Sequence, residues 1–206
     1  MKTVYNKTLK YNWTMKNIIE QAFKMALKSR YDNIFEQYYP GNSNGINEVN
    51  LTVNFCTSLV ETLAKNNASK SFAAYELPIR KNERIDGVVF CKELSSVFFI
   101  ESKKLKNSQD NYKRSLEKDL FRMVTEEVRG QILTEEWKGV KNQYLVCLAD
   151  HWLIKQDRTE AMIEWFYSLN HTEKKEVVYK DLISDFSNTA DWKEKYNILV
   201  NVYRIN

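Results

Sequence analysis

The chain has 206 residues, of which 43% are hydrophobic and 28% charged, the composition of an ordinary soluble protein with enough material for one buried core. It contains no low-complexity tract or repeat, and nowhere do about 18 apolar residues follow one another, which excludes a membrane-spanning helix. Residues 1 to 7 lack the apolar stretch of a secretory signal, so we expect neither secretion nor a membrane partner.

Charge and cysteine content indicate the cellular compartment that we expect for the protein, but they do not indicate its function. The net charge of +4 is too mild to indicate a nucleic-acid partner by itself. Cys56, Cys91 and Cys147 are odd in number and lie in apolar stretches, so we expect buried thiols in a reducing compartment and a cytoplasmic location. Neither their spacing nor the two histidines suggests a zinc site.

Helices are expected first in the chain. Residues 14 to 38 are amphipathic and predict a helix or a pair of helices, within an N-terminal helical addition over residues 1 to 45. After a turn-forming cluster, Asn47 is placed as the N-cap of a helix from residue 48 to about residue 65. An apolar stripe at helical spacing predicts the face of this helix that packs on the core: Leu51, Phe55, Leu59 and Leu63.

Glu48 stands one turn ahead of that stripe, on the same side of the helix. We therefore expect its carboxylate to point toward the sheet. A first-turn acid is also favoured by the helix dipole, and this ordinary role is the alternative explanation.

Three strands are expected next. Residues 74 to 79 predict a first strand, at an edge or a strand end because Pro78 cannot donate to a ladder. Residues 85 to 91 and 97 to 102 are rich in β-branched and aromatic side chains and flank a polar turn, so they predict an antiparallel hairpin. Together these segments predict a three-stranded antiparallel meander.

The hairpin carries charge on strands that should be buried. Strand period places Glu101 and Lys103 on one face after an apolar lead-in, and Asp86 can meet them from the preceding strand. A buried ion is costly unless it is paired or holds a metal. An ion pair at a fraying strand end is the alternative, since three other acid-x-Lys triplets occur, at 136 to 138, 173 to 175 and 191 to 193. Only the triplet at 101 to 103 lies at the end of an apolar strand and has an acidic residue, Asp86, on the strand before it.

Basic residues gather directly after this triplet. A helix is expected from a cap at Ser108 to about Val128, with Tyr112, Leu116, Leu120, Val124 and Val128 inward. Its opposite, exposed side would then carry four cations: Arg114, Lys118, Arg122 and Arg129. Such a stripe can track a phosphate backbone, with Lys104 beside it. A solvated helix face with ordinary surface pairs is the alternative.

The remaining segments predict scaffold. Residues 143 to 149 form a continuous apolar run typical of a buried strand reached by a crossover from the hairpin. A helix over 157 to 169 and late strands over 176 to 183 and 196 to 205 predict an α/β extension of residues 151 to 206. His151 follows the buried strand and is expected to be a packing residue.

The acid on one strand and the acid-x-Lys on the next resemble the PD-(D/E)XK nuclease superfamily, over roughly residues 46 to 150. Ile85 stands where that motif has proline. The resemblance implies a restriction-endonuclease-like α/β core in the order helix, three-stranded antiparallel meander, helix, strand, within one domain of residues 1 to 206. It also implies magnesium, with manganese as substitute, held by Asp86, Glu101, the Ser102 backbone carbonyl and Glu48.

On this resemblance we expect metal-dependent hydrolysis of DNA phosphodiester bonds. Lys103 would orient the attacking water and add positive charge, while Lys104, Arg114, Lys118 and Arg122 would contact the nucleic acid. Double-stranded DNA is the expected partner, and a homodimer is left open. One alternative is a catalytically silent nucleic-acid-binding or assembly module of the same fold, and another is a structural protein in which the charged triad is an incidental ion network.

Overall fold

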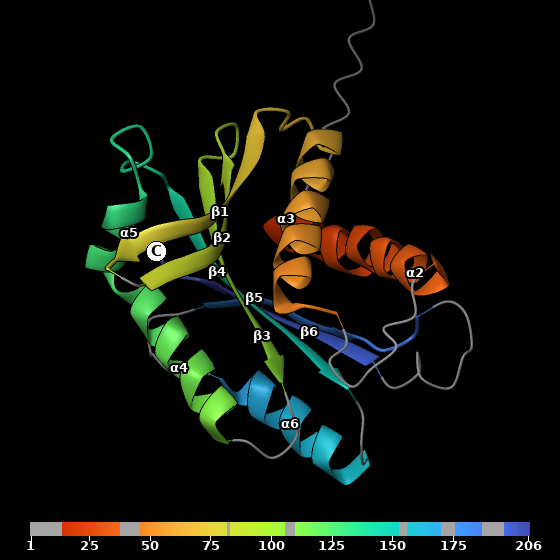
Figure 1. Cartoon of the computed structure of the whole chain (residues 1–206). Helices are drawn as coiled ribbons and strands as arrows, with labels where there is room; N and C mark the ends of the chain where they lie inside the picture. Colours follow the sequence, from red (N-terminus) through yellow and green to blue (C-terminus); the bar gives the residue numbers. More distant parts are fainter. Residues whose placement is uncertain are drawn as a thin grey trace, which may run out of the picture.

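A mixed sheet forms the centre of the molecule. The computed structural model describes residues 14–37, 46–81, 83–105, 110–152, 156–169, 176–186 and 196–206. Its six strands follow the order β1-β2-β3-β4-β6-β5 (Figure 1), so the predicted α/β class is confirmed. They are β1 (Ser71–Arg80), β2 (Glu83–Cys91), β3 (Ser96–Leu105), β4 (Asn142–Trp152), β5 (Glu176–Ile183) and β6 (Tyr196–Arg204).

The strand pairing follows the predicted order. β1, β2 and β3 form an antiparallel meander, and β3 pairs with β4 in parallel. A parallel neighbour needs a crossover, which α4 (Asp110–Val124) and α5 (Glu126–Ile132) provide. Pro78 lies in β1 at the edge of the sheet, where a missing N–H is tolerated. β6 pairs with both β4 and β5, so the C-terminal segment continues the same sheet.

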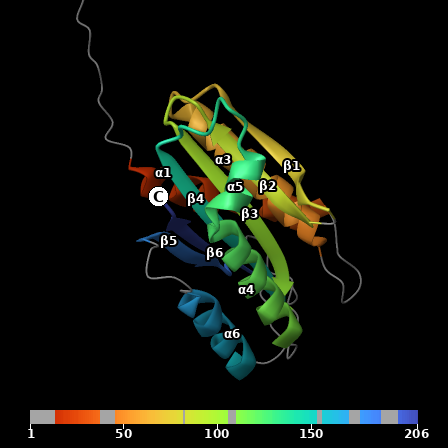
Figure 2. The ribbon, with the colours of Figure 1, turned by 90° about the vertical axis from the view of Figure 1, so that its left-hand side faces the viewer.

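Helices cover both faces of the sheet. α3 (Glu48–Lys65) lies on one face together with α1 (Met15–Glu20) and α2 (Lys28–Gln37), whereas α4, α5 and α6 (Gln156–Ser168) lie on the other (Figure 1, Figure 2). Each face has its own apolar core. Because both sides of β3 are covered, its sequence is an almost unbroken apolar run until the charged triplet.

The helix that carries Glu48 forms as predicted. Asn47 caps α3, and its side-chain oxygen accepts a hydrogen bond from the Val49 N–H at 3.4 Å. The four residues of the predicted stripe are all buried: Leu51, Phe55, Leu59 and Leu63. α3 is therefore anchored along its length, and its first turn is fixed above the sheet.

The N-terminal addition is helical from residue 15 to residue 37, as predicted. α1 and α2 are joined by a π-helical segment, Gln21–Leu27, without a break in the helix. Its buried side chains are Ile18, Ile19, Ala22, Phe23, Leu27, Tyr31 and Phe35. The turn-forming cluster at 40 to 45 lies outside the described residues.

The single helix expected from Ser108 to Val128 is wrong in its second half. Thr125 adopts an extended conformation and separates α4 from α5. The break turns Arg129 inward, where it is only 7% exposed and donates to the Gln143 side chain and the Met123 carbonyl, so it does not belong to an exposed stripe. Leu116, Leu120 and Val128 are buried as expected. Ser108 and the side chains of Tyr112 and Val124 lie outside the described part.

Several smaller expectations are also confirmed. All three cysteines are buried and free. His151 is a buried packing residue, with Nδ1 3.1 Å from the Leu105 carbonyl and Nε2 3.2 Å from the Thr159 hydroxyl. In the described ranges, no helix has the length and apolar character needed to cross a membrane.

Candidate active site

The site begins where β2 and β3 separate. Their ladder ends at the pair Gly87 and Ile100; beyond it, β2 stays paired with β1 and β3 with β4. The Ser102 N–H, which has no partner in that ladder, donates to Asp86 Oδ2 at 2.7 Å. The carboxylate of Asp86 thus lies beside the segment from Glu101 to Lys103, as the strand pattern predicted.

Gly87 allows α3 to approach this separation closely. A Cβ atom on Gly87 would lie 2.9 Å from Thr52 Cγ2 and 3.0 Å from Cys56 Sγ, so no larger residue fits without displacement. Thr52 in turn donates from its hydroxyl to the Ser102 hydroxyl at 2.7 Å, and Ser102 is fully buried. The α3 helix, β2 and β3 are therefore held together at the site itself.

Glu101 is the most buried acid of the site. Its side chain is 1% exposed, and its Oε1 lies 3.1 Å from Arg122 Nη2 of α4. Burial raises the pKa of Glu101 well above its usual range, and the carboxylates of Asp86 and Asp119 raise it further. Arg122 and Lys103 offset only part of this effect. The positive charges of Arg122 and Lys103 therefore compensate the Glu101 carboxylate only in part.

The charge of Asp86 is also incompletely compensated by its surroundings. Burial raises the pKa of Asp86, and the negative charges of Glu48 and Glu76 add to the effect. The Ser102 N–H and the Lys103 ammonium lower the pKa but do not cancel the shift.

Lys103 lies among carboxylates. Its Nζ is 3.1 Å from Asp119 Oδ2 and 3.4 Å from Glu48 Oε1. Burial by itself lowers the pKa of Lys103, but the surrounding acids, Glu48 and Asp119 foremost, more than offset this and raise it. The side chain is consequently an ammonium ion throughout the neutral range.

Glu48 reaches the sheet from the first turn of α3, as expected. Besides its contact with Lys103, its Oε2 accepts a hydrogen bond from the Lys104 N–H at 3.1 Å. The two contacts tie the start of α3 to the end of β3. They give Glu48 a structural role, and its role as a metal ligand stays a prediction, as does that of the Ser102 carbonyl.

The expectation that Arg122 lies on an exposed helix face is wrong. Its side chain is only 16% exposed and, besides Glu101, it contacts Asp119 at 3.5 Å, Glu83 at 3.8 Å and the Arg84 carbonyl at 3.2 Å. The reason is that the polar ends of β2 and β3 lie directly under the last turns of α4. Arg122 is an internal partner of the acids.

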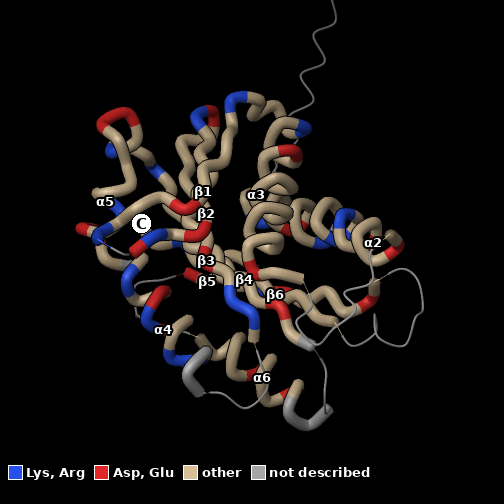
Figure 3. Tube along the Cα trace, in the orientation of Figure 1, with Lys and Arg blue, Asp and Glu red and all other residues tan. Residues whose placement is uncertain are grey.

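The rest of the basic helix does not form a continuous band. Arg114 and Lys118 are exposed, whereas Lys113 Nζ lies 5.1 Å above the Trp165 ring. Acidic positions alternate with the basic ones along α4 (Figure 3). Lys104 is half buried, with its Nζ 3.4 Å from the Ile46 carbonyl. Phosphate contact by Lys104, Arg114 and Lys118 stays a prediction.

Three acids of this region were missed by the sequence reasoning. Asp119 bridges Lys103 and Arg122, and its spacing of three from Arg122 on one helix was a usable signal. Glu76 lies near Asp86, and no sequence pattern marks it. Asp150 of β4 pairs with Lys104 of β3 and is 1% exposed. Its Oδ2 accepts a hydrogen bond from the Tyr196 hydroxyl at 2.8 Å, and burial raises the pKa of Asp150 to about 7.

The donors suit a hard divalent cation, although they are not gathered around one point. Among the described residues, no group of three or more acidic, histidine or cysteine side chains is close enough together to form a ready-made metal site. Lys103 and Arg122 occupy the carboxylates instead. With Asp86, Glu101, Glu48 and Asp119 ionised, the two cations leave a net charge of two negative, to which Glu83 and Glu76 add, so a divalent ion would reduce the negative charge of the site.

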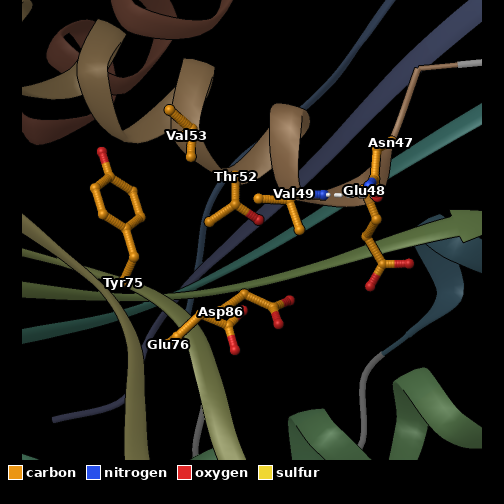
Figure 4. A pocket seen from close by; sticks show the side chains of 8 residues that line it. All are labelled: Asn47, Glu48, Val49, Thr52, Val53, Tyr75, Glu76 and Asp86. Atoms are coloured by element: carbon orange, nitrogen blue, oxygen red, sulfur yellow. Dashed lines mark hydrogen bonds between the residues drawn. The ribbon is translucent and has the colours of Figure 1, made fainter.

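A cavity opens on the α3 side of Asp86. It has a volume of about 290 Å³ and lies between the first turns of α3 and the strands β1 and β2 (Figure 4). Glu48, Thr52 and Asp86 line it together with Tyr75 and Glu76 of β1. The charged cluster is thus accessible from outside through a cavity with a mixed polar and apolar wall.

Comparison of the chain with protein-family models, with curated proteins and with solved structures found no match. The fold and the site define a coarse class: an α/β protein in which β2 and β3 separate and carry a buried cluster of acids and bases. The helices α3 and α4 supply partners to this cluster.

Proposed function

We propose that this protein hydrolyses phosphodiester bonds of DNA with the help of a divalent metal ion, magnesium or manganese. The observation that carries the proposal is the meeting of Asp86 with Glu101 and Lys103 at the point where β2 and β3 separate. Burial raises the pKa of both acids, and perturbed carboxylates beside a cavity are typical of functional sites. The element order around them agrees with the restriction-endonuclease-like core that the sequence resembles.

The ligands proposed for the ion are Asp86, Glu101, the Ser102 carbonyl and Glu48. All are oxygen donors, which magnesium prefers. When bound, the ion would supply an acidified water and neutralise charge that develops on the phosphate. Arg122 provides the positive charge next to Glu101, so binding of the ion requires that the Arg122 side chain moves away from Glu101.

Lys103 acts as a donor and not as a base in this proposal. Because its pKa is raised, it keeps its proton at neutral pH and can hold a water molecule or a phosphate oxygen by a charged hydrogen bond. Glu48 and Asp119 fix the position of its ammonium group from two helices. These two acids are positioning residues for Lys103.

The test is cleavage of plasmid and linear DNA with magnesium or manganese, by wild type and by Lys103→Met. We expect the variant to lose most cleavage while keeping its fold and the rise in melting temperature that calcium should give, because the ammonium group acts on the reacting groups. Lys92→Met is the matched control: Lys92 also forms an ion pair, with Glu136, but lies in the turn at the other end of the hairpin. Equal cleavage by both variants, or none by wild type, would refute the proposal.

A second candidate function is a nucleic-acid-binding module that does not cleave. It is favoured by the Glu101–Arg122 pair, because Arg122 already contacts the most buried acid at 3.1 Å. This module would bind DNA in a salt-dependent way and leave it intact in magnesium. Neutralising Arg114 or Lys118 would then lower the salt slope of log K by roughly one for each phosphate that the side chain had neutralised. Absence of both binding and cleavage would instead favour a purely structural ion network.

A further inference from the structure

The cavity beside Asp86 has an apolar wall that the charged cluster does not explain. Val49 and Val53 of α3 and Tyr75 of β1 line it, and they are 53%, 37% and 38% exposed. Single exposed apolar side chains are common on proteins, but here three from two elements face one hollow next to buried charges. In Figure 4 the Tyr75 ring stands at one side of the hollow, with Val53 and Thr52 across from it.

The edge of the same cavity carries an acid in an unusual backbone conformation. Glu76 has φ of 52°, a left-handed conformation that non-glycine residues seldom adopt. The β1–β2 register steps from Tyr75–Gly87 to Leu77–Ile85 and leaves out Glu76 and Asp86. In Figure 4 the two carboxylates lie close together at the lower edge of the cavity. The distorted backbone thus presents Glu76 next to Asp86.

Size and charge limit what the cavity can hold. Its volume of about 290 Å³ is at the lower limit of sites for small molecules, about 300 to 1,000 Å³, and suits a single planar ring system. A phosphate group is repelled by Glu48, Glu76 and Asp86 on the rim. A flat ring with N–H donors on its edge fits both the aromatic and valine wall and the carboxylate acceptor of Glu76.

A nucleobase has this combination of properties, and the proposed function brings one to this place. If Asp86 helps to hold the metal ion that binds the scissile phosphate, the adjoining cavity receives the neighbouring nucleoside. In a paired duplex the base is stacked and its Watson–Crick edge is occupied, so only an unpaired base can enter. Guanine offers two neighbouring N–H donors to one carboxylate, whereas thymine offers a single donor between two carbonyl oxygens.

We propose that the cavity between α3 and β1 binds an unpaired base of the DNA substrate, guanine in preference to thymine, by stacking on Tyr75 and hydrogen bonding to Glu76. This inference rests on the proposed function, because it requires a nucleic-acid substrate. It directs the protein to DNA with an unpaired nucleotide next to the cleaved bond, at a mismatch, loop or end.

Binding is the direct test, with calcium in place of magnesium so that the DNA stays intact. The probes are three duplexes of equal length: one fully paired, one with a single unpaired guanine and one with a single unpaired thymine. Wild type should bind the unpaired guanine duplex most tightly. Tyr75→Leu should weaken that binding roughly 5- to 150-fold, the equivalent of about 1–3 kcal/mol per stacked base, and leave the paired duplex unaffected.

Two further variants test separately the stacking on Tyr75 and the hydrogen bonding to Glu76. Tyr75→Phe keeps the ring and should keep the affinity, which shows that a loss in Tyr75→Leu comes from stacking. Glu76→Gln should abolish the preference for guanine over thymine, a factor of the same order. Glu127→Gln is its control. Both acids are exposed and contact an arginine, Glu76 with Arg84 at 3.9 Å and Glu127 with Arg80 at 2.8 Å, but Glu127 lies away from the cavity on α5.

The outcomes also separate this inference from the proposed function. Equal binding of all three duplexes by wild type, or an unchanged preference in Tyr75→Leu, overturns the base site even if the protein cleaves DNA. A preference for unpaired guanine that depends on Tyr75, without cleavage in magnesium, supports the base site and refutes the hydrolytic activity. If wild type binds none of the duplexes, both fail together.

Discussion

Replacing Arg122 with methionine tests whether the buried carboxylate of Glu101 depends on a nearby cation. The two side chains are 3.1 Å apart, and Glu101 is 1% exposed. Methionine retains most of the apolar stem of arginine and removes only the charge and its hydrogen bonds. Removing one partner of a buried pair costs roughly 3–5 kcal/mol, because it leaves an uncompensated charge in a poorly solvated place.

Protonation of Glu101 limits this cost. A carboxyl group that stays protonated in the folded protein, against an unfolded pKa of about 4.3, costs about 1.36 kcal/mol per pH unit and thus about 3.7 kcal/mol at pH 7. Arg122 lowers the pKa of Glu101, so its removal raises that pKa further; the added penalty is absent below the unfolded pKa and grows as the pH rises. We expect Arg122→Met to lower the free energy of unfolding by about 3 kcal/mol at pH 7 and by less than about 1 kcal/mol near pH 4.5.

Urea unfolding between about pH 4.5 and pH 8 measures both quantities. Glu101→Gln in the Arg122→Met background should recover most of the loss, since the carboxylate that had lost its arginine is then absent. Arg80→Met is the control, because the side chains of Arg80 and its partner Glu127 are 51% and 68% exposed, and it should cost under about 1 kcal/mol at any pH. If both arginine variants lose the same stability without pH dependence, Glu101 does not depend on Arg122.

Three further predictions concern the metal, the α3 contact and Asp150. Millimolar magnesium, manganese or calcium should raise the melting temperature of wild type, and Asp86→Asn should abolish most of the gain; equal thermal shifts would contradict the site. Gly87→Ala should lower the unfolding free energy by about 1–3 kcal/mol, because the added Cβ would lie 2.9 Å from Thr52 Cγ2. Gly139→Ala is the control and should change the unfolding free energy little, because a Cβ there would have no atom within 4 Å. Similar losses in the two variants would refute the tight contact. The pKa of Asp150 is about 7 in the folded protein and about 3.9 when unfolded. Wild type should therefore lose about 3 kcal/mol between pH 4 and pH 7 that Asp150→Asn does not lose; parallel urea-unfolding profiles would argue against this.

Much of the fold follows from local patterns in the sequence. The spacing of Leu51, Phe55, Leu59 and Leu63 predicts α3 and its buried face, and Asn47 marks its start. The apolar run before Glu101 predicts a strand covered on both sides, and the strand period brings Glu101 and Lys103 to one side of β3. These features depend on backbone periods of about 3.6 and two residues, which operate within a few neighbouring positions.

The charge partners could not be predicted in this way. A helical wheel places Arg122 opposite the inward residues of α4, yet the ends of β2 and β3 lie beneath it and supply Glu83 and Glu101 as partners. The break at Thr125 that turns Arg129 inward also depends on how α5 packs against the sheet.

The sequence by itself determined α3 and its buried face, the strands of the meander and the side of β3 that carries Glu101 and Lys103, because these depend on local backbone geometry. Only the tertiary structure decided that β2 and β3 separate after Gly87, that Asp86 binds the freed Ser102 N–H, and that Glu76 and Tyr75 flank a cavity there. Strand separation and ion pairing join residues far apart in the chain. Their energies depend on burial and on distances that no short sequence pattern contains.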